Sequence, residues 1–236
     1  MTIDRDQLKR AAAQGALHYV KNGMVVGLGS GSTASFVVQA LGARMATGLK
    51  IVGIPTSERT ATLARSLGIP LATFAEYQRI DLTIDGADEV ERGSLNLIKG
   101  MGGALLREKI VAAASRRLVI VVDQEKLVDR LGDNTAVPVE VVQFGWQSTA
   151  AALERLGAAP RLRPAGEDHP FITDGGNYIL DCPFGGIGDP QSLERRINSI
   201  VGVVECGLFI GRSSDVIVAA PDGVEVLTPA GGARGG

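Results

Sequence analysis

Cysteine and histidine are scarce in this sequence, with two of each among 236 residues. Two thiols, Cys182 and Cys206, cannot form the disulfide framework of a small secreted domain. The first ten residues are charged and lack the apolar core of a signal peptide. These absences favour a cytoplasmic protein that keeps its cysteines reduced.

Metal-binding patterns are also missing from the sequence. His18 and His169 stand alone, and no histidine, cysteine or carboxylate group recurs at the spacing of metal ligands. We therefore expect no metal site.

Long apolar runs and an excess of one charge are absent as well. No stretch approaches the roughly 18 apolar residues of a membrane span, so the sequence predicts none. The formal net charge is -2, so no overall field attracts nucleic acid or a membrane surface. An anionic ligand would have to be held by local groups.

What the sequence does contain is an alternation of apolar runs and helical patterns between residues 8 and 122. Each apolar run stops at or just before Gly, Pro or Asp, which do not continue a buried strand. Strands are predicted at 24–28, 50–54, 80–85 and 117–122, and helices at 8–19, after 33, at 58–67 and from 103. This order predicts an α/β fold with a parallel sheet covered by helices on both faces.

The pattern changes near residue 131. Strand patterns at 137–142, 177–180 and 201–206 alternate with helix patterns at 149–156 and 191–200, which predicts a smaller α+β unit. Two last strands, 216–219 and 224–227, are expected to rejoin the first sheet. We therefore predict a first domain of residues 1–130 and 207–230, a small domain of residues 131–206 and a frayed tail at 231–236.

A turn rich in glycine and hydroxyl groups, Gly29-Ser30-Gly31-Ser32-Thr33, lies between the first strand and the next helix. Glycines let the backbone approach a ligand, and the free N–H groups of a helix start attract anions. The turn lacks the full GxGxxG spacing and the Gly-Lys-Ser/Thr of a Walker loop. An anion cradle and a tight turn with a hydroxyl N-cap are both compatible with this pattern.

The stretch from Asp85 to Glu108 holds the candidate chemistry. It places Asp85, Asp88 and Lys99 after a strand end, and Glu108 on about the second turn of the next helix. Ligands of open α/β sheets bind beyond the strand carboxyl ends, so these groups are candidates for acid–base chemistry on a small polar substrate. Each has a plainer interpretation too: an Asx turn or magnesium site for the aspartates, a solvated lysine, and a helix-dipole partner for Glu108.

Four motifs follow one another in register: GSGSTA at 29–34, DGADE at 85–89, KGMGGA at 99–104 and REK at 107–109. Together they resemble ribose-5-phosphate isomerase of the A type, and the likeness continues through Asp123, Lys126 and residues 176–181, 202–205 and 207–209. The resemblance implies a Rossmann-like domain interrupted by a smaller one, in a homodimer or homotetramer, without a metal or organic cofactor. We assign Phe144 and Trp146 to a core or an interface.

The activity implied by the resemblance is that of an aldose–ketose isomerase. It would interconvert D-ribose 5-phosphate and D-ribulose 5-phosphate through an enediolate, in the non-oxidative branch of the pentose phosphate pathway. Glu108 corresponds to the proton acceptor; we add Asp85 as a proton relay and Lys99 as the group that stabilises the oxyanion. The expected substrate-binding residues are Ser30, Gly31, Ser32, Thr33, Asp85, Gly86, Ala87, Asp88, Lys99, Gly100, Met101, Gly102 and Lys126, with the phosphate at Ser32, Thr33 and Lys126.

Two departures from the family pattern affect local contacts. Met101 replaces a frequent glycine, so the approach of the backbone to the substrate is expected to differ there. Cys206 stands where histidine or another polar residue is expected.

Two other classes of protein share this fold type. A sugar-phosphate sensor would bind its ligand without turnover, but it normally carries a helix-turn-helix, for which we expect no room before Met24. A coenzyme A transferase would use a glutamate as nucleophile and is usually longer. Turnover of ribose 5-phosphate separates the enzyme from the sensor.

Overall fold

A six-stranded sheet forms the centre of the larger half of the molecule. The computed structural model describes residues 4–166 and 169–229, so the predicted tail at 231–236 lies outside the described residues. The strand order is β14-β13-β6-β3-β1-β2, and only β14 runs antiparallel to its neighbour. The strands are β1 (Val25–Leu28), β2 (Val52–Pro55), β3 (Leu82–Asp85), β6 (Leu118–Asp123), β13 (Asp215–Ala220) and β14 (Gly223–Leu227).

Helices cover both faces of this sheet because apolar side chains project from both. Val119 and Val121 of β6 share a core with α1, α2 and α3, whereas Ile120 belongs to a core with α4 and a smaller sheet. The helices are α1 (Arg5–Ala16), α2 (Ser32–Ala46), α3 (Glu58–Ser66) and α4 (Leu105–Ala113), with short 3₁₀ turns η1 (Leu17–Tyr19) and η2 (Gln124–Lys126). The prediction of a parallel sheet with helices on both faces is confirmed. No helix among residues 4–166 and 169–229 is long and apolar enough to cross a membrane.

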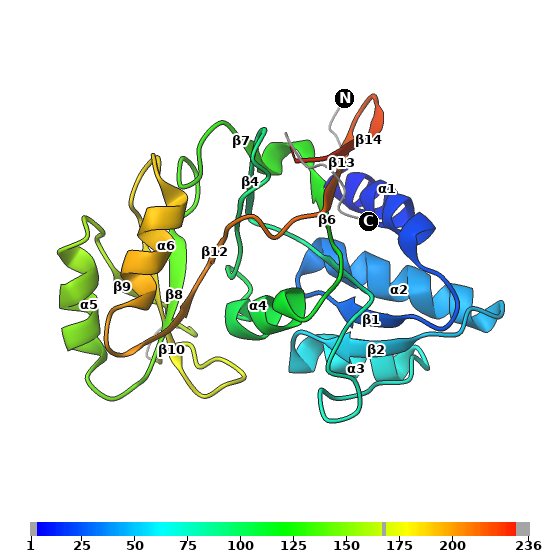
Figure 1. Ribbon diagram of the computed structural model, residues 1–236, viewed down its shortest axis with the longest axis horizontal. Coiled ribbons are helices and arrows are strands. Elements are labelled where there is room, and N and C mark those ends of the chain that lie inside the picture. The colour runs from blue at the N-terminus through cyan, green and yellow to red at the C-terminus, as the bar shows by residue number, and fades with distance from the viewer. Residues whose placement is uncertain (1–3, 167–168, 230–236) are drawn as a thin grey trace.

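An antiparallel sheet builds the smaller half of the molecule, at the opposite end from α1, α2 and α3 (Figure 1). Its order is β11-β8-β10-β9. The elements are β8 (Val137–Val141), β9 (Arg161–Leu162), β10 (Tyr178–Cys182), β11 (Val203–Cys206), α5 (Trp146–Glu154) and α6 (Pro190–Asn198). Leu153 of α5 and Ile197 of α6 share a core with Val139 and Leu180 of the sheet. The predicted smaller α+β unit is confirmed.

A third sheet, which the sequence did not predict, joins the two halves. Its order is β12-β5-β4-β7, from β4 (Glu89–Glu91), β5 (Leu97–Ile98), β7 (Leu127–Val128) and β12 (Leu208–Phe209). Successive residues of a strand point to opposite faces. Accordingly, Leu97 belongs to the core of the large sheet and Ile98 to the core of the small one. The third sheet therefore fixes the two halves against each other.

Candidate active site

A cavity of about 230 Å³ opens where β1, β3 and β6 end. The chain passes from β1 to β2 on one side of β1 and then to β3 on the other, so these strand ends lie at the switch point where open α/β sheets bind ligands. Most of the predicted site residues line the cavity: Ser30, Gly31, Ser32, Thr33, Gly86, Ala87, Asp88, Lys99, Gly100, Gly102, Glu108 and Lys126. Asp85 and Met101 do not line it.

Asp85 lies behind the cavity wall and holds three groups in place. Its Oδ1 accepts hydrogen bonds from the N–H groups of Ser30 at 3.0 Å and Gly86 at 2.8 Å, and its Oδ2 lies 3.1 Å from Lys99 Nζ. A Cβ atom at position 29 would lie 2.3 Å from Oδ1, so only glycine allows the two strand ends to approach this closely. Burial raises the pKa of Asp85, against the three donors that favour its ionised form.

The Ser30 hydroxyl belongs to a network of hydroxyl groups beside the cavity. It lies 2.7 Å from Thr56 Oγ1, 2.8 Å from Ser57 Oγ and 3.2 Å from Thr60 Oγ1. Thr60 in turn donates to the carbonyl oxygen of Gly29 at 3.0 Å. These bonds fix the loop between β1 and α2, so the side chain of Ser30 shapes the loop.

Helix α2 begins at the cavity, and its first N–H groups have no acceptor in the described part of the chain. Gly31 occupies the N-cap position with a φ of 91° and offers no side-chain cap. The N–H groups of Ser32 and Thr33 are among the donors that every helix start leaves unpaired, and the helix dipole makes this end positive. Because both residues line the cavity, this end of the cavity suits an anion.

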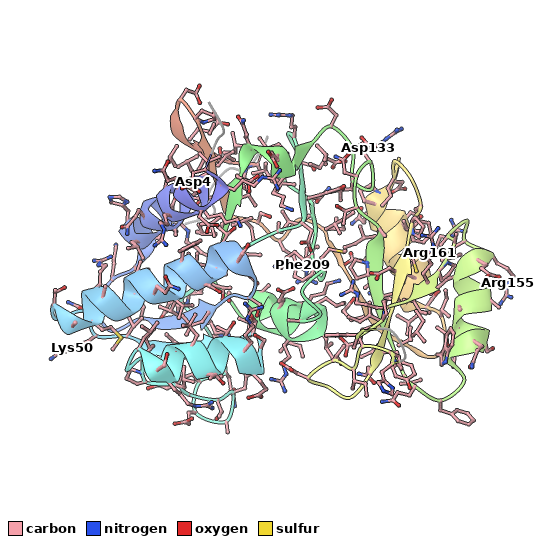
Figure 2. The ribbon with its side chains drawn as sticks, turned by 180° about the vertical axis from the view of Figure 1, so that it is seen from behind. Asp4, Lys50, Asp133, Arg155, Arg161 and Phe209 are labelled. Carbon is pink, nitrogen blue, oxygen red and sulfur yellow. The ribbon has the colours of Figure 1, made fainter. Side chains whose placement is uncertain are left out.

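Lys99 is a buried cation between two carboxylates. Its Nζ lies 3.1 Å from Asp85 Oδ2 and 3.4 Å from Glu108 Oε1, and donates to the carbonyl oxygen of Gly86 at 2.6 Å. Phe209, in the middle of the molecule (Figure 2), places its ring centroid 5.6 Å from this ammonium. Burial opposes the charge, but the Asp85 and Glu108 carboxylates outweigh burial and raise the pKa of Lys99. Lys99 is therefore a fixed positive charge in the cavity wall.

Glu108 combines burial with an unoccupied carboxylate oxygen. Its Oε1 faces Lys99, whereas its buried Oε2 has no hydrogen-bond partner among the described residues. Burial raises the pKa of Glu108 to about 8; Lys99 opposes the rise, and Asp85 and Asp88 add to it. A carboxyl group that titrates near neutral pH and has a free oxygen is suited to take and return a proton.

Helix α4 begins at Leu105, two residues later than predicted. Gly103 has a φ of 81°, a conformation that cannot be part of a right-handed helix. Glu108 consequently lies in the first turn of α4, and its predicted place on the second turn is wrong.

Asp88 and the turn from Gly100 to Gly103 form a further side of the cavity. Asp88 Oδ2 accepts a hydrogen bond from the Met101 N–H at 3.0 Å. The Met101 side chain is 47% exposed and does not line the cavity, so it does not obstruct the backbone there. The expected effect of Met101 on backbone approach finds no support in this geometry.

Four lining residues were not predicted as site residues: Arg5, Lys9, Asp123 and Glu125. Arg5 Nη2 lies 2.7 Å from Glu125 Oε2, which connects α1 to η2, and Lys9 lies one helical turn after Arg5. The sequence does show two basic residues four positions apart on the first helix, and this pattern could have indicated a contribution to the site. Only tertiary packing, however, brings the start of α1 to the end of β6.

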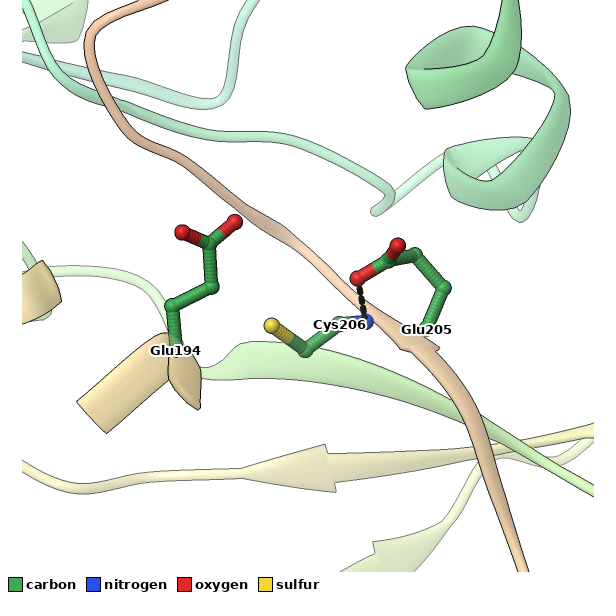
Figure 3. Close-up of side chains that lie close together, drawn as sticks. All are labelled: Glu194, Glu205 and Cys206. Carbon is green, nitrogen blue, oxygen red and sulfur yellow. Dashed lines mark hydrogen bonds between the residues drawn. The ribbon is translucent and has the colours of Figure 1, made fainter. Parts of the chain in front are cut away.

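Among the described residues, one group of possible metal ligands lies outside the cavity. Glu194, Glu205 and Cys206 come together between α6 and β11 (Figure 3). Lys109 Nζ lies 3.0 Å from Glu194 Oε1 and 2.9 Å from Glu205 Oε1, so one ammonium group already pairs with both acids and offsets half of their charge. Burial raises the pKa of Cys206 to about 11, which keeps its thiol protonated. We interpret the group as an ion-pair network that anchors α4.

The switch point of this α/β sheet holds a buried carboxylate with a free oxygen, a fixed ammonium group and an open helix start. These groups are suited to acid–base chemistry on a small anionic ligand. The family model of ribose 5-phosphate isomerase A (phosphoriboisomerase A) matches residues 52–223. The chain belongs to this family, which confirms the resemblance of its motifs.

Individual relatives match along nearly their whole length. A ribose-5-phosphate isomerase A of Gloeobacter violaceus is 62% identical over 227 residues, 96% of this chain and 98% of the relative. The structure of ribose 5-phosphate isomerase A from Methanocaldococcus jannaschii has a TM-score of 0.91 and 42% identity, covering 95% of this chain and all (100%) of that one. A D-ribose-5-phosphate isomerase in complex with phospho-erythronic acid has a TM-score of 0.92 and 39% identity, covering 96% of this chain and 100% of that one.

Proposed function

We propose that this protein is an aldose–ketose isomerase that interconverts D-ribose 5-phosphate and D-ribulose 5-phosphate. The observation that carries the proposal is Glu108 Oε2, a buried carboxylate oxygen at the cavity without a partner among the described residues. Isomerisation needs a base for the proton that moves between C2 and C1, and groups that stabilise charge on O1 and O2. Membership of the isomerase family supports ribose 5-phosphate as the substrate.

The proton would move through Glu108. Its carboxylate takes the proton from C2 of the open-chain aldose, which leaves an enediolate. The O2 hydroxyl proton then passes to O1, and the same carboxyl group returns its proton to C1, so that the carbonyl forms at C2. Lys99 shares the negative charge that develops on the enediolate oxygens. The reverse reaction uses the same groups in the opposite order.

The two aspartates take different parts in this proposal. Both carboxylate oxygens of Asp85 are engaged behind the wall, so we assign Asp85 a positioning role through Lys99 in place of the proton relay expected from the sequence. Asp88 lines the cavity, and one of its oxygens has no partner in the described part of the chain. Asp88 is therefore placed to contact sugar hydroxyl groups.

The phosphate would bind at the start of α2. Free N–H groups at Ser32 and Thr33 and the helix dipole favour a dianion there, and Lys126 and Lys9 line the same cavity. Phospho-erythronic acid, which a structural relative binds, carries a carboxylate and a phosphate. Its carboxylate resembles the charged O1 and O2 of an enediolate, so the acid should compete with ribose 5-phosphate here.

The cellular setting belongs to the same proposal. We place the protein in the cytoplasm, in the non-oxidative branch of the pentose phosphate pathway, as a homodimer or homotetramer. Cys182 and Cys206 are buried free thiols, as a reducing compartment allows. Phe144 is 95% exposed and Val201 is 94% exposed, which suits an interface between copies.

The experiment is turnover of ribose 5-phosphate by the purified protein in heavy water. We expect ribulose 5-phosphate with deuterium at C1, because a carboxyl group in a partly open cavity exchanges its proton with solvent. Chelation should leave the rate unchanged, and free ribose should be a very poor substrate. Stoichiometric binding of ribose 5-phosphate without turnover would support the sensor instead. Loss of activity on chelation, restored by a divalent ion, would contradict the metal-free mechanism.

A further inference from the structure

Arg163 is a buried cation from the small half of the molecule that reaches the edge of the cavity. It directly follows β9, and its backbone is fixed on both sides: its N–H donates to Ile179 O at 2.9 Å, and its carbonyl oxygen accepts from Phe171 N–H at 2.8 Å. The residue is 9% exposed. Its guanidinium pairs with both carboxylate oxygens of Asp181, including Nε to Oδ2 at 3.0 Å. This bidentate pair leaves the second terminal nitrogen, Nη1, in one orientation.

That nitrogen binds the turn which carries the backbone donors of the site. Arg163 Nη1 donates to Gly100 O at 2.8 Å and to Met101 O at 3.0 Å. The Gly100 carbonyl also accepts from the Gly103 N–H at 3.0 Å, which closes the turn. The turn is therefore fixed by a charged group from outside the large sheet.

The orientation of two carbonyls determines the orientation of two N–H groups. In a trans peptide the N–H of the next residue points away from the C=O. With Gly100 O on Arg163, the Met101 N–H points the other way, and it donates to Asp88 Oδ2 at 3.0 Å. With Met101 O on Arg163, the Gly102 N–H likewise points away from the guanidinium. Gly102 lines the cavity, and its N–H has no partner in the part of the chain that the structure describes.

A second contact supports the turn from the same side. The ring of Phe171 lies against Gly103, where a Cβ atom would come within 2.3 Å of it. The turn is thus pressed between the small half and the cavity. The Arg163 contacts with the two carbonyls therefore favour the present orientations of the Met101 and Gly102 N–H groups.

We propose that Arg163 is a positioning residue for the isomerisation: it holds the carbonyls of Gly100 and Met101 so that the Gly102 N–H points at an enediolate oxygen. The positive guanidinium also polarises these peptides and strengthens their N–H groups as donors. Because the enediolate forms only during the reaction, this donor acts on the transition state more than on bound substrate. The inference rests on the proposed isomerase function and adds a residue that does not touch the substrate.

The test compares Arg163→Met/Asp181→Asn with wild type and with Arg161→Met. The double variant removes both partners of the ion pair and leaves no uncompensated charge. Arg161 is exposed at the start of β9 (Figure 2), so its variant controls for the loss of an arginine side chain from this segment. The measurements are kcat and KM for ribose 5-phosphate, and the inhibition constants of inorganic phosphate and of phospho-erythronic acid. Circular dichroism and the Tm check folding.

We expect kcat of the double variant to fall by at least about tenfold, while KM and the inhibition constant of inorganic phosphate stay within about twofold. The inhibition constant of phospho-erythronic acid should rise by about the factor by which kcat/KM falls, because its carboxylate uses the same N–H. Arg161→Met should behave as wild type. If Arg163 had only a general structural role, the double variant would bind inorganic phosphate and phospho-erythronic acid more weakly by the same factor.

A folded double variant with kcat within about twofold of wild type would overturn the inference. Equal loss of affinity for phosphate and for phospho-erythronic acid would also overturn it. If the double variant does not fold, Arg163→Lys decides by the same measurements, because lysine keeps the charge beside Asp181 but lacks the planar fork. Wild-type protein without turnover would refute the proposed function, and this inference with it, before any variant is compared.

Discussion

At the scale of single residues, the central feature is one ammonium group shared by two buried carboxylates. Lys99 lies within 3.4 Å of both Asp85 and Glu108, so the three groups carry a net negative charge when both acids are ionised. Asp85 has further donors from the backbone, whereas Glu108 Oε2 has none among the described residues. Glu108 is therefore the acid that keeps its proton to a higher pH.

The pH dependence of turnover should report this carboxyl group. With a pKa of about 8, Glu108 is the required base only when it has lost its proton. We expect kcat/KM to rise about tenfold per pH unit below pH 8 and to level off above it. Steady-state rates from pH 6.5 to 9.5 measure the profile, and Lys126→Ala should lower it without moving its midpoint. A flat profile across this range would contradict the assignment of the base.

The same raised pKa predicts how stability changes with pH. The folded protein binds the Glu108 proton more tightly than the unfolded chain, so this stabilisation is complete below about pH 4.5 and is lost as the pH rises toward 8. Glu108→Gln mimics the neutral acid at every pH. We expect a Tm close to wild type at pH 5 and about 5 °C above it at pH 8.5. A Tm difference that shrinks with rising pH would show that the buried carboxylate is not the destabilising group.

Site residues could be predicted from the sequence where a charged side chain lies next to a predicted turn. Glu108, Lys99 and Asp88 were assigned to the site in this way, and the structure brings them to one cavity. The contacts that the side chains of Asp85 and Ser30 make with other segments of the chain could not be predicted from the sequence. Asp85 meets the Ser30 N–H only after β1 and β3 have come together, and the Ser30 hydroxyl meets Thr56 only after β1 and β2 have.

At the scale of elements, the start of α2 and the short turn η2 define the phosphate end of the cavity. The helix supplies unpaired N–H groups, and η2 brings Lys126 to the same space. The acids Asp123 and Glu125 also line this end, so the cations must overcome a local negative charge to hold a dianion. Phosphate binding at this site therefore depends on the lysine side chains as well as on the N–H groups of the helix start.

Removing one lysine should weaken substrate binding and spare the chemical step. We expect Lys126→Ala to raise KM for ribose 5-phosphate by about tenfold or more, and to raise it more than Glu108→Gln does. Lys50→Ala is the matched control, since Lys50 is exposed and does not line the cavity (Figure 2). Steady-state kinetics with ribose 5-phosphate and with free ribose separate the effects. If Lys126→Ala lowered kcat/KM equally for ribose 5-phosphate and for free ribose, the assignment of Lys126 to the phosphate site would be wrong.

Elements with a clear period were predicted from the sequence, and those without one were missed. β6 is a buried run of six residues, and apolar runs of this kind between residues 24 and 122 predicted the parallel sheet. The third sheet was not predicted because β5, β7 and β12 have two residues each, too few to show a strand pattern. The start of α4 was misplaced because the apolar pattern begins just after Gly103, and the sequence does not show that this glycine has a positive φ.

At the scale of the whole molecule, three basic residues connect the small half to the segment that carries the catalytic groups. Arg163 holds Gly100 and Met101, Arg107 Nη1 lies 3.4 Å from Asp174 Oδ2, and Lys109 pairs with acids of α6 and β11. The small half therefore acts as a support for the stretch from Gly100 to Lys109. Its sequence carries none of the candidate catalytic side chains.

We propose the domain division predicted from the sequence, with residues 1–130 and 207–230 in one domain and 131–206 in the other. The cores of the two sheets are separate, apart from the third sheet that joins them. The two domains should therefore exchange amide hydrogens as separate cooperative blocks. One common opening free energy throughout β6 and β8 would contradict the division.

The oligomeric state can be tested on the small domain. Phe144 is almost fully exposed, and burial of its ring between copies would stabilise a dimer or tetramer. Phe144→Ser should shift the mass measured by light scattering toward the monomer at micromolar concentration, with little change in the far-ultraviolet circular dichroism spectrum. Tyr77→Ser, at a 41% exposed tyrosine of the large domain, is the control. An unchanged mass for Phe144→Ser would place the interface elsewhere.

The central claim is that Glu108 takes the substrate proton, and turnover by Glu108→Gln tests it most directly. The substitution keeps the size of the side chain and removes the base, so at pH 8.5 we expect kcat to fall by at least about a hundredfold. Glu140→Gln is the matched control, because Glu140 is equally buried, outside the cavity, and bonded to Thr173 and Asn177. It should turn over ribose 5-phosphate at close to the wild-type rate. A folded Glu108→Gln protein with near-normal turnover would contradict the account.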